Sequence, residues 1–175
     1  MHVKGNLNHK GIRLVEDNEF SISNLVLKDI LEAVISRKKS LRFQAKGFSM
    51  FPFICNNDLV TISPFLNSYI GLGQIVAFLC PPKQSLVIHR IIGRKAHGYI
   101  FKGDNVFAID GVIPRENILG YVSRVERKGK IINWGLGWPR RLIVFLSRAR
   151  ILPLFSRLAR LMPLAIKKFL NEKLF

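Results

Sequence analysis

The sequence predicts a mainly β protein with flanking helices, built around an antiparallel β domain that forms a coiled sheet or a partly open barrel. Between residues 40 and 134, short segments rich in Val, Ile and Phe are separated by turn residues. A segment with helical spacing precedes them, and a basic amphipathic pattern follows them. We therefore divide the chain into an N-terminal arm and helix (1–39), a β domain (40–134) and a basic helical extension (135–175).

The N-terminal part is expected to contain one helix. Residues 1–20 are polar and irregular, which indicates a loose arm. Residues 21–39 have helical periodicity, and Ser21 or Ser23 can cap the start of this helix. Its predicted apolar face is Leu27, Ile30, Leu31, Val34 and Ile35.

The β domain is predicted from seven short segments. Each is rich in β-branched or aromatic residues, and turn residues such as Asn56-Asn57 and Lys128-Gly129 separate them. The predicted strands are 41–47, 58–63, 74–79, 86–93, 99–103, 120–127 and 130–134.

The C-terminal extension is basic and amphipathic. Residues 140–175 contain nine Lys or Arg and one acid, Glu172. Pro153 and Pro163 divide the pattern, so we expect two or three short helices, each with its proline near the start. The expected apolar face is Ile151, Phe155, Leu158, Met162, Ala165 and Phe169, and the expected basic face is Arg150, Arg157, Arg160, Lys167 and Lys168.

The charge balance bears on partners and location. The 28 Lys and Arg against 11 Asp and Glu give a net charge of +17, which favours an anionic partner. The extension fits a hairpin packed on the β domain as well as it fits an anionic membrane surface, and we do not expect nucleic acid. No run of about 18 uncharged apolar residues predicts a membrane span, and no signal peptide is recognised. We expect a peripheral membrane protein, or otherwise a cytoplasmic one.

Two residues stand out as candidates for acyl-transfer chemistry. Ser49 lies in the turn-like stretch GFSMFPF, where it is either a filler residue or a nucleophile that needs a base. His89 is the only histidine inside an apolar strand, where it is either structural or that base. Arg90 should point to the opposite face, because side chains alternate along a strand. The two Cys residues form no Cys-x-x-Cys or Cys/His cluster, so we expect neither a metal nor a cofactor.

The order of the motifs is more specific than any one of them. GFSMFPFI, NNDLVTI, GQIVAF, VIHRIIG, FKGDNVFAID and ILGYV, in this order, resemble the signal peptidase I family over residues 40 to 126. The His-Arg pair resembles the endoplasmic-reticulum and archaeal-type branch, in which the base is His. The resemblance implies a serine endopeptidase on a mostly antiparallel β domain, with signal-peptide-type processing of a precursor protein or peptide.

The resemblance also implies roles for individual residues. Ser49 would be the nucleophile and His89 the general base. Asp110 would orient His89, and Asp104, the second acid, would structure the turn or the surroundings of Arg90.

The same resemblance implies a substrate site around Ser49. An extended substrate would lie beside the strands that flank this serine. Met50 and Pro52 would shape the turn, and Phe48 would line a side-chain pocket or form an apolar rim. Gly47 replaces the Ser or Thr that helps to bind the oxyanion in bacterial members.

Two other functions remain open. Family members normally carry an N-terminal membrane anchor that is not recognised here, and the basic extension is a candidate replacement. A non-catalytic peptide-binding or membrane-surface-binding module on the same fold is one alternative. An autoproteolytic repressor-type peptidase is the other, although such proteins use a Lys base and a DNA-binding module.

Overall fold

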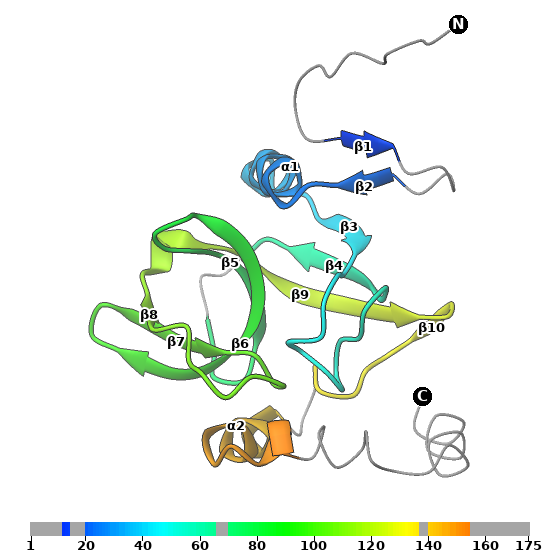
Figure 1. The fold of residues 1–175 in the computed structure, drawn as a ribbon. Helices are drawn as coiled ribbons and strands as arrows, with labels where there is room; N and C mark the ends of the chain where they lie inside the picture. The colour runs from blue at the N-terminus through cyan, green and yellow to red at the C-terminus, as the bar shows by residue number, and fades with distance from the viewer. Residues whose placement is uncertain (1–11, 15–19, 66–69, 137–139, 155–175) are drawn as a thin grey trace, which may run out of the picture.

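The computed structural model describes residues 12–14, 20–65, 70–136 and 140–154. A β hairpin and one helix precede the main sheet, and a second helix follows it (Figure 1). The first elements are β1 (Ile12–Leu14), β2 (Phe20–Ile22), α1 (Asn24–Ser36), β3 (Leu41–Gln44), β4 (Leu59–Ser63), β5 (Ile75–Cys80) and β6 (Ser85–Lys95). They are followed by β7 (Gly98–Lys102), β8 (Val112–Ile113), the 3₁₀ turn η1 (Arg115–Asn117), β9 (Ile118–Arg127), β10 (Lys130–Ile131) and α2 (Arg140–Arg148).

The main sheet has eight strands, and all of its pairings are antiparallel. Its order is β3-β4-β9-β5-β6-β7-β8, and β10 pairs with β9. In the part of the chain that the structure describes, the end strands β3 and β8 do not pair, so the sheet is open. The predicted class, mainly antiparallel β with flanking helices, is therefore confirmed.

Register shifts account for the curvature of the sheet, which is visible in Figure 1. The extra residues are Ser123 and Leu119 of β9, where it pairs with β4 and β5, and Ile92 of β6, where it pairs with β7. An extra residue in one strand of a pair bends that strand and increases its twist. The long strand β6 pairs with β5 along its first half and with β7 only from Arg90 onward.

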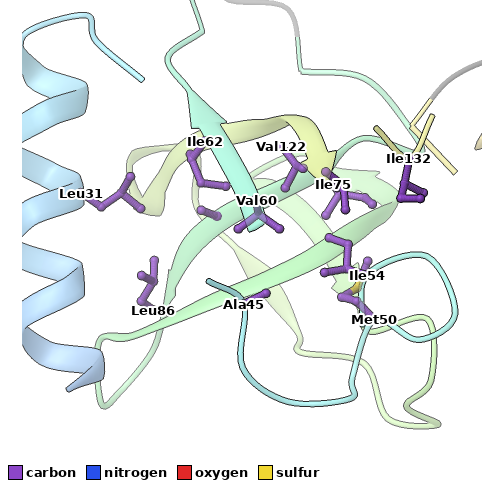
Figure 2. Close-up of a cluster of buried hydrophobic side chains, with 12 residues drawn as sticks. Leu31, Ala45, Met50, Ile54, Val60, Ile62, Ile75, Leu86, Val122 and Ile132 are labelled. Atoms are coloured by element: carbon purple, nitrogen blue, oxygen red, sulfur yellow. The ribbon is translucent and has the colours of Figure 1, made fainter. Parts of the chain in front are cut away.

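The main core lies between α1 and one side of the sheet. Figure 2 shows Leu31 pointing from α1 toward the sheet, where it is fully buried. The cluster also contains Ala45, Met50, Ile54, Val60, Ile62, Ile75, Ala77, Leu86, Val122, Val125 and Ile132. A second cluster on the other side of β5 includes Phe78 and Phe101, whose rings stack with their centroids 4.4 Å apart.

The structure settles which serine caps the first helix. The Ser23 side chain accepts a hydrogen bond of 3.4 Å from the Val26 N–H. This bond satisfies one of the N–H groups that a helix start leaves without a partner. Of the two serines proposed from the sequence, Ser23 is therefore the N-cap.

Short strands were the main error of the sequence prediction. Part of the expected loose arm forms the β1–β2 hairpin, with Ile12 opposite Ile22. The two-residue strand β8 was not predicted, and the segment 130–134 contributes only two residues to β10. Segments of two or three residues carry no periodic pattern, because alternation needs about four residues to be visible.

The C-terminal extension begins as a helix that packs on the β domain. In α2, Ile143, Val144 and Ser147 are buried. Residues 151–154 are again helical, and Pro153 is near the start of that piece, as predicted. The rest of the predicted extension, including all of its expected apolar face except Ile151, lies outside the described residues. Within those residues, no helix is long and apolar enough to cross a membrane.

Candidate active site

Ser49 lies in a compact turn between β3 and β4. Gly47 has φ at +103°, which favours glycine, and its N–H donates to Asn56 Oδ1 over 2.9 Å. After Ser49, the Met50 carbonyl accepts from the Ile54 N–H over 3.0 Å. No described residue accepts a hydrogen bond from the Ser49 N–H, so this donor remains available to a ligand.

A second loop fixes this turn from outside. The Asn105 N–H donates to the Ser49 carbonyl over 2.7 Å, and its side-chain amide donates to the Phe48 carbonyl over 3.0 Å. Both bonds engage backbone groups, so they hold the position of the turn while the Ser49 side chain remains uninvolved.

His89 is held by a carboxylate. On β6, its Nδ1 is 2.6 Å from Asp110 Oδ2, and the imidazole is largely buried. Asp110 is fixed in turn, because its N–H donates to the Phe101 carbonyl over 3.0 Å. A carboxylate can only accept at this position, so the proton of the neutral ring lies on Nδ1. Nε2 then has a free lone pair.

Gly103 lies between the serine turn and the histidine. A Cβ atom built on Gly103 would be 2.8 Å from the Ser49 carbonyl oxygen and 2.9 Å from His89 Nε2. Both atoms therefore border the same small space, and only a residue without a side chain fits there. In this structure, the Ser49 hydroxyl makes no hydrogen bond to His89 or to any other described residue.

Arg90 forms a separate buried cluster on the opposite face of β6. Its Nε and Nη2 donate to Asp104 over 2.9 and 2.8 Å, and both side chains are fully buried. Its Nη1 donates to the carbonyls of Gly73 and Gly135 over 2.8 and 2.9 Å. Asp104 therefore pairs with Arg90, and Asp110 is the acid that contacts His89.

A groove of about 700 Å³ passes along Ser49 and His89. Its wall is largely aliphatic, and it is formed by α1, the end of β3, the serine turn and the start of β6. The lining residues are Asn24, Leu27, Phe43, Gln44, Ala45, Lys46, Gly47, Ser49, Met50, Ile54, Leu86, Val87, Ile88 and His89.

Within the described residues, both walls of the groove have a strand edge without a neighbouring strand. β3 is at the end of the sheet and pairs only with β4. Residues 85–89 of β6 pair with β5 but not with β7. Unpaired edges offer N–H and C=O groups to an extended peptide. The groove can therefore bind an extended peptide by backbone pairing on one or both sides.

Other residues assigned to the substrate site have different surroundings. Gly47 and Met50 line the groove, whereas Phe48 and Pro52 do not. Phe48 is 60% exposed, and Pro52 is buried. Phe53 is also buried, and it packs beside α2 with Ile143.

A Ser/Lys pair is also present, but it is inaccessible to a substrate. Lys102 Nζ donates to the Ser147 carbonyl over 2.7 Å and is 3.2 Å from its hydroxyl. Burial lowers the pKa of Lys102; Asp104 raises this pKa and Arg150 lowers it further. Because Ser147 is fully buried, no substrate can reach its hydroxyl. This pair attaches α2 to β7.

Asp58 has a structural role. It accepts the Cys55 N–H over 2.7 Å, and its two oxygens bind Arg127 over 2.9 and 2.8 Å. The hydrogen bonds from Arg127 to Asp58 raise the pKa of Arg127, because they stabilise its charged form. The ion pair fixes the loop after the serine turn to β9.

Comparison with known protein-family models finds no match to this chain, and comparison with curated proteins finds none either. The interpretation of the site therefore depends on its geometry and on the motifs in the sequence.

Sequence reasoning missed three residues that shape this site. Gly103 and Asn105 flank Asp104 in a stretch that alone indicates only a turn. Asn24 is in the first turn of α1, far from the motifs in sequence. Their roles depend on contacts between distant segments, and the spacing of residues along the chain gives no signal for these contacts.

Proposed function

We propose that the protein is a serine endopeptidase of signal-peptidase type, which cleaves an extended segment of a precursor protein or peptide. The observation that carries this proposal is the Asp110–His89 pair, whose free Nε2 borders the same space as the Ser49 turn. A carboxylate, an imidazole and a serine in this order are the parts that activate a serine nucleophile.

The substrate binds in the groove as an added strand. Backbone groups at the edges of β3 and β6 pair with it, and the aliphatic wall accepts small apolar side chains. A substrate that pairs with these strands has one peptide carbonyl beside Ser49.

The reaction follows from the orientation of His89. Ser49 Oγ attacks the carbonyl carbon while Nε2 takes its proton, and Asp110 stabilises the imidazolium. The Ser49 N–H donates to the developing oxyanion. The C–N bond then breaks, and His89 gives the proton to the leaving amine. Water, activated by the same nitrogen, hydrolyses the resulting ester.

Proton transfer requires the hydroxyl and Nε2 to approach to about 2.6–3.2 Å, and this contact often forms only when substrate is bound. Gly47 brings no side-chain donor to the oxyanion. Loss of one such donor elsewhere lowers the rate by about 10²–10³-fold. We therefore expect slow turnover unless the substrate or another backbone N–H completes the oxyanion site.

The test is cleavage of precursor peptides by the purified protein, detected by mass spectrometry. Ser49→Ala and His89→Gln should each abolish cleavage while circular dichroism remains unchanged. Ser36→Ala is the matched control, because Ser36 is an exposed serine at the end of α1. Cleavage by the Ser49→Ala protein at the rate of the unchanged protein contradicts the proposal.

A non-catalytic peptide-binding module is the second candidate. It is favoured by one observation, which is the absence of a hydrogen bond between the Ser49 hydroxyl and His89. A fluorophosphonate probe distinguishes the two, because it reacts with an activated serine. Labelling of Ser49 that is lost in His89→Gln supports the peptidase, and no labelling of either protein supports the binding module.

A further inference from the structure

Asn24, the first residue of α1, occupies part of the β6 edge that faces the groove. Its side-chain nitrogen donates to the Leu86 carbonyl over 3.1 Å, and its side-chain oxygen accepts from the Leu86 N–H over 3.0 Å. A residue in a neighbouring antiparallel strand exchanges the same two bonds with its partner. The Asn24 amide therefore replaces a peptide unit at Leu86.

This contact defines how much of β6 remains open. Since Leu86 directs its backbone groups away from β5, alternation along the strand directs those of Ile88 the same way. Arg90, two residues further, is opposite Lys102 of β7. Between these two contacts, Ile88 is the residue whose N–H and C=O face the groove, and no described residue outside the strand ladders bonds to them.

The opposite wall has a matching open residue. Ala45 bonds to the β4 side, because its N–H donates to the Asp58 carbonyl and its own carbonyl accepts from the Asn57 N–H, both over 2.8 Å. Alternation then turns the backbone groups of Gln44 toward the groove. An extended peptide can therefore pair with Ile88 on one side and Gln44 on the other.

We propose that Asn24 limits the length of substrate that can pair with β6, because its side chain occupies the backbone groups of Leu86. From His89 to Leu86 is three residues, or about 10 Å at about 3.3 Å per residue. A chain whose reacting carbonyl lies beside His89 thus extends about three residues toward α1 before it meets Asn24. Substrate residues beyond Asn24 do not pair with β6. The protein therefore recognises a short apolar segment, and the sequence of the substrate on the far side of Asn24 does not affect binding. This inference rests on the proposed peptide-binding role of the groove.

An asparagine suits this role because its amide both donates and accepts. Asp would keep the acceptor for the Leu86 N–H but would lose the donor, and Ala would lose both. The Ser23 cap fixes the first turn of α1 and so holds the Asn24 side chain at the strand edge.

The test uses Ser49→Ala protein, so that binding is measured whether or not the protein is an enzyme. The probes are acetylated, amidated Ala/Val peptides of about two to eight residues, and binding is followed by titration and by NMR of the Ile88 and Leu86 amides. With Asn24 present, affinity should stop rising once the paired segment ends at Asn24, and only the Ile88 amide should respond. In Asn24→Ala, the Leu86 amide should exchange quickly in the free protein and become protected by the longer peptides. Their affinity should rise about fivefold for the added backbone bond.

Leu25→Ala is the matched control, because Leu25 is exposed in the same turn of α1. It should behave like the unchanged protein. If Asn24→Ala does not fold, Asn24→Asp removes only the bond to the Leu86 carbonyl and should produce part of the effect. Equal length dependence with and without Asn24, or no peptide binding by any variant, overturns the inference. The proposed peptidase fails separately, if peptides bind as expected but no Ser49-dependent cleavage occurs.

Discussion

At Gly103, the backbone leaves space for nothing larger than a hydrogen atom between the serine turn and the histidine. A methyl group there would approach the Ser49 carbonyl, His89 Nε2 and Val106 Cγ2 within 3.0 Å, so one of them must move. Displacement of a catalytic group by about 1 Å can lower the rate about 10²-fold. We therefore expect Gly103→Ala to reduce kcat/KM for peptide cleavage by about that factor, with a loss of about 1–3 kcal/mol in the free energy of unfolding from overpacking.

Gly129→Ala provides the control for this substitution. Gly129 has φ at +77° in the β9–β10 turn, and a Cβ added there would meet no atom within 4 Å. Alanine there is strained but far from Ser49, so it should lower stability and leave kcat/KM unchanged. Equal activity of Gly103→Ala and the unchanged protein would show that the space beside Nε2 is unimportant for cleavage.

The sequence suggested some of these residues and not others, for a physical reason. Ser49 and His89 stand out because a hydroxyl in an apolar turn and an imidazole in an apolar strand are unusual in themselves. Asp110 was assigned to orient His89 only through the family resemblance, because no pattern in the chain separates it from Asp104. The contact of Asp110 with Nδ1 and the pairing of Asp104 with Arg90 are the contacts that this assignment expects. Gly103 acts through an absent side chain, which no composition or periodicity can reveal.

At the scale of elements, the join between β7 and α2 depends on one buried cation. Lys102 is buried, and burial lowers its pKa from the ordinary 10.5. Below the lowered pKa, both folded and unfolded states carry the charge, and the folded state bears the full desolvation penalty. As pH rises toward 10.5, Lys102 loses its proton in the folded state before it does so in the unfolded state. The unfolded state then binds more protons, so the contribution of Lys102 to the free energy of unfolding increases with pH.

Lys102→Met should therefore change the pH dependence of stability. The free energy of unfolding of the unchanged protein, minus that of Lys102→Met, should rise with pH in this window, by at most about 1.4 kcal/mol per pH unit. Urea denaturation from neutral pH to pH 10.5 measures it. The exposed Lys39→Met controls for net charge. If this difference in the free energy of unfolding stays constant or falls with pH, burial does not disfavour the charged form of Lys102.

Elements with a clear pattern were predictable, and those held by neighbours were not. α1 and the strands β3 to β7 and β9 have enough residues for periodicity to identify them. β8 and β10 have two residues each and exist because β7 and β9 offer them an edge. Periodicity placed Leu31 on the core correctly, with Leu27 and Ile35 packed against it, but Ile30 of the predicted apolar face is exposed. Periodicity also gave no sign that the same helix would form one wall of the groove.

The whole molecule is strongly basic, and α2 combines this charge with an exposed apolar face. Opposite its buried residues, Leu142 and Phe145 are 59% and 67% exposed, with Arg141 exposed beside them. Residues 140–154 contain four Arg and no acid. Exposed apolar side chains surrounded by cations are typical of helices that lie on anionic lipid surfaces. We propose that this face binds such a surface.

Vesicle sedimentation tests this surface. The protein should bind vesicles that contain phosphatidylglycerol, and it should bind phosphatidylcholine vesicles weakly. Arg141→Gln should weaken binding about fivefold, because one cation near the surface contributes about 1 kcal/mol. Phe145→Ser should weaken it by about tenfold or more, through loss of apolar burial. The control is Leu25→Ser, an equally exposed leucine on α1.

Salt separates the two contributions to lipid binding. Raising the salt concentration should weaken binding of the unchanged protein by screening its charges, and Arg141→Gln should be less sensitive to salt. Phe145→Ser should keep the salt sensitivity, since it retains every cation. Binding that is equal for neutral and anionic vesicles, or unchanged in both α2 variants, contradicts a lipid-binding role. Tight binding to DNA without vesicle binding would indicate that the basic surface binds nucleic acid and not lipid.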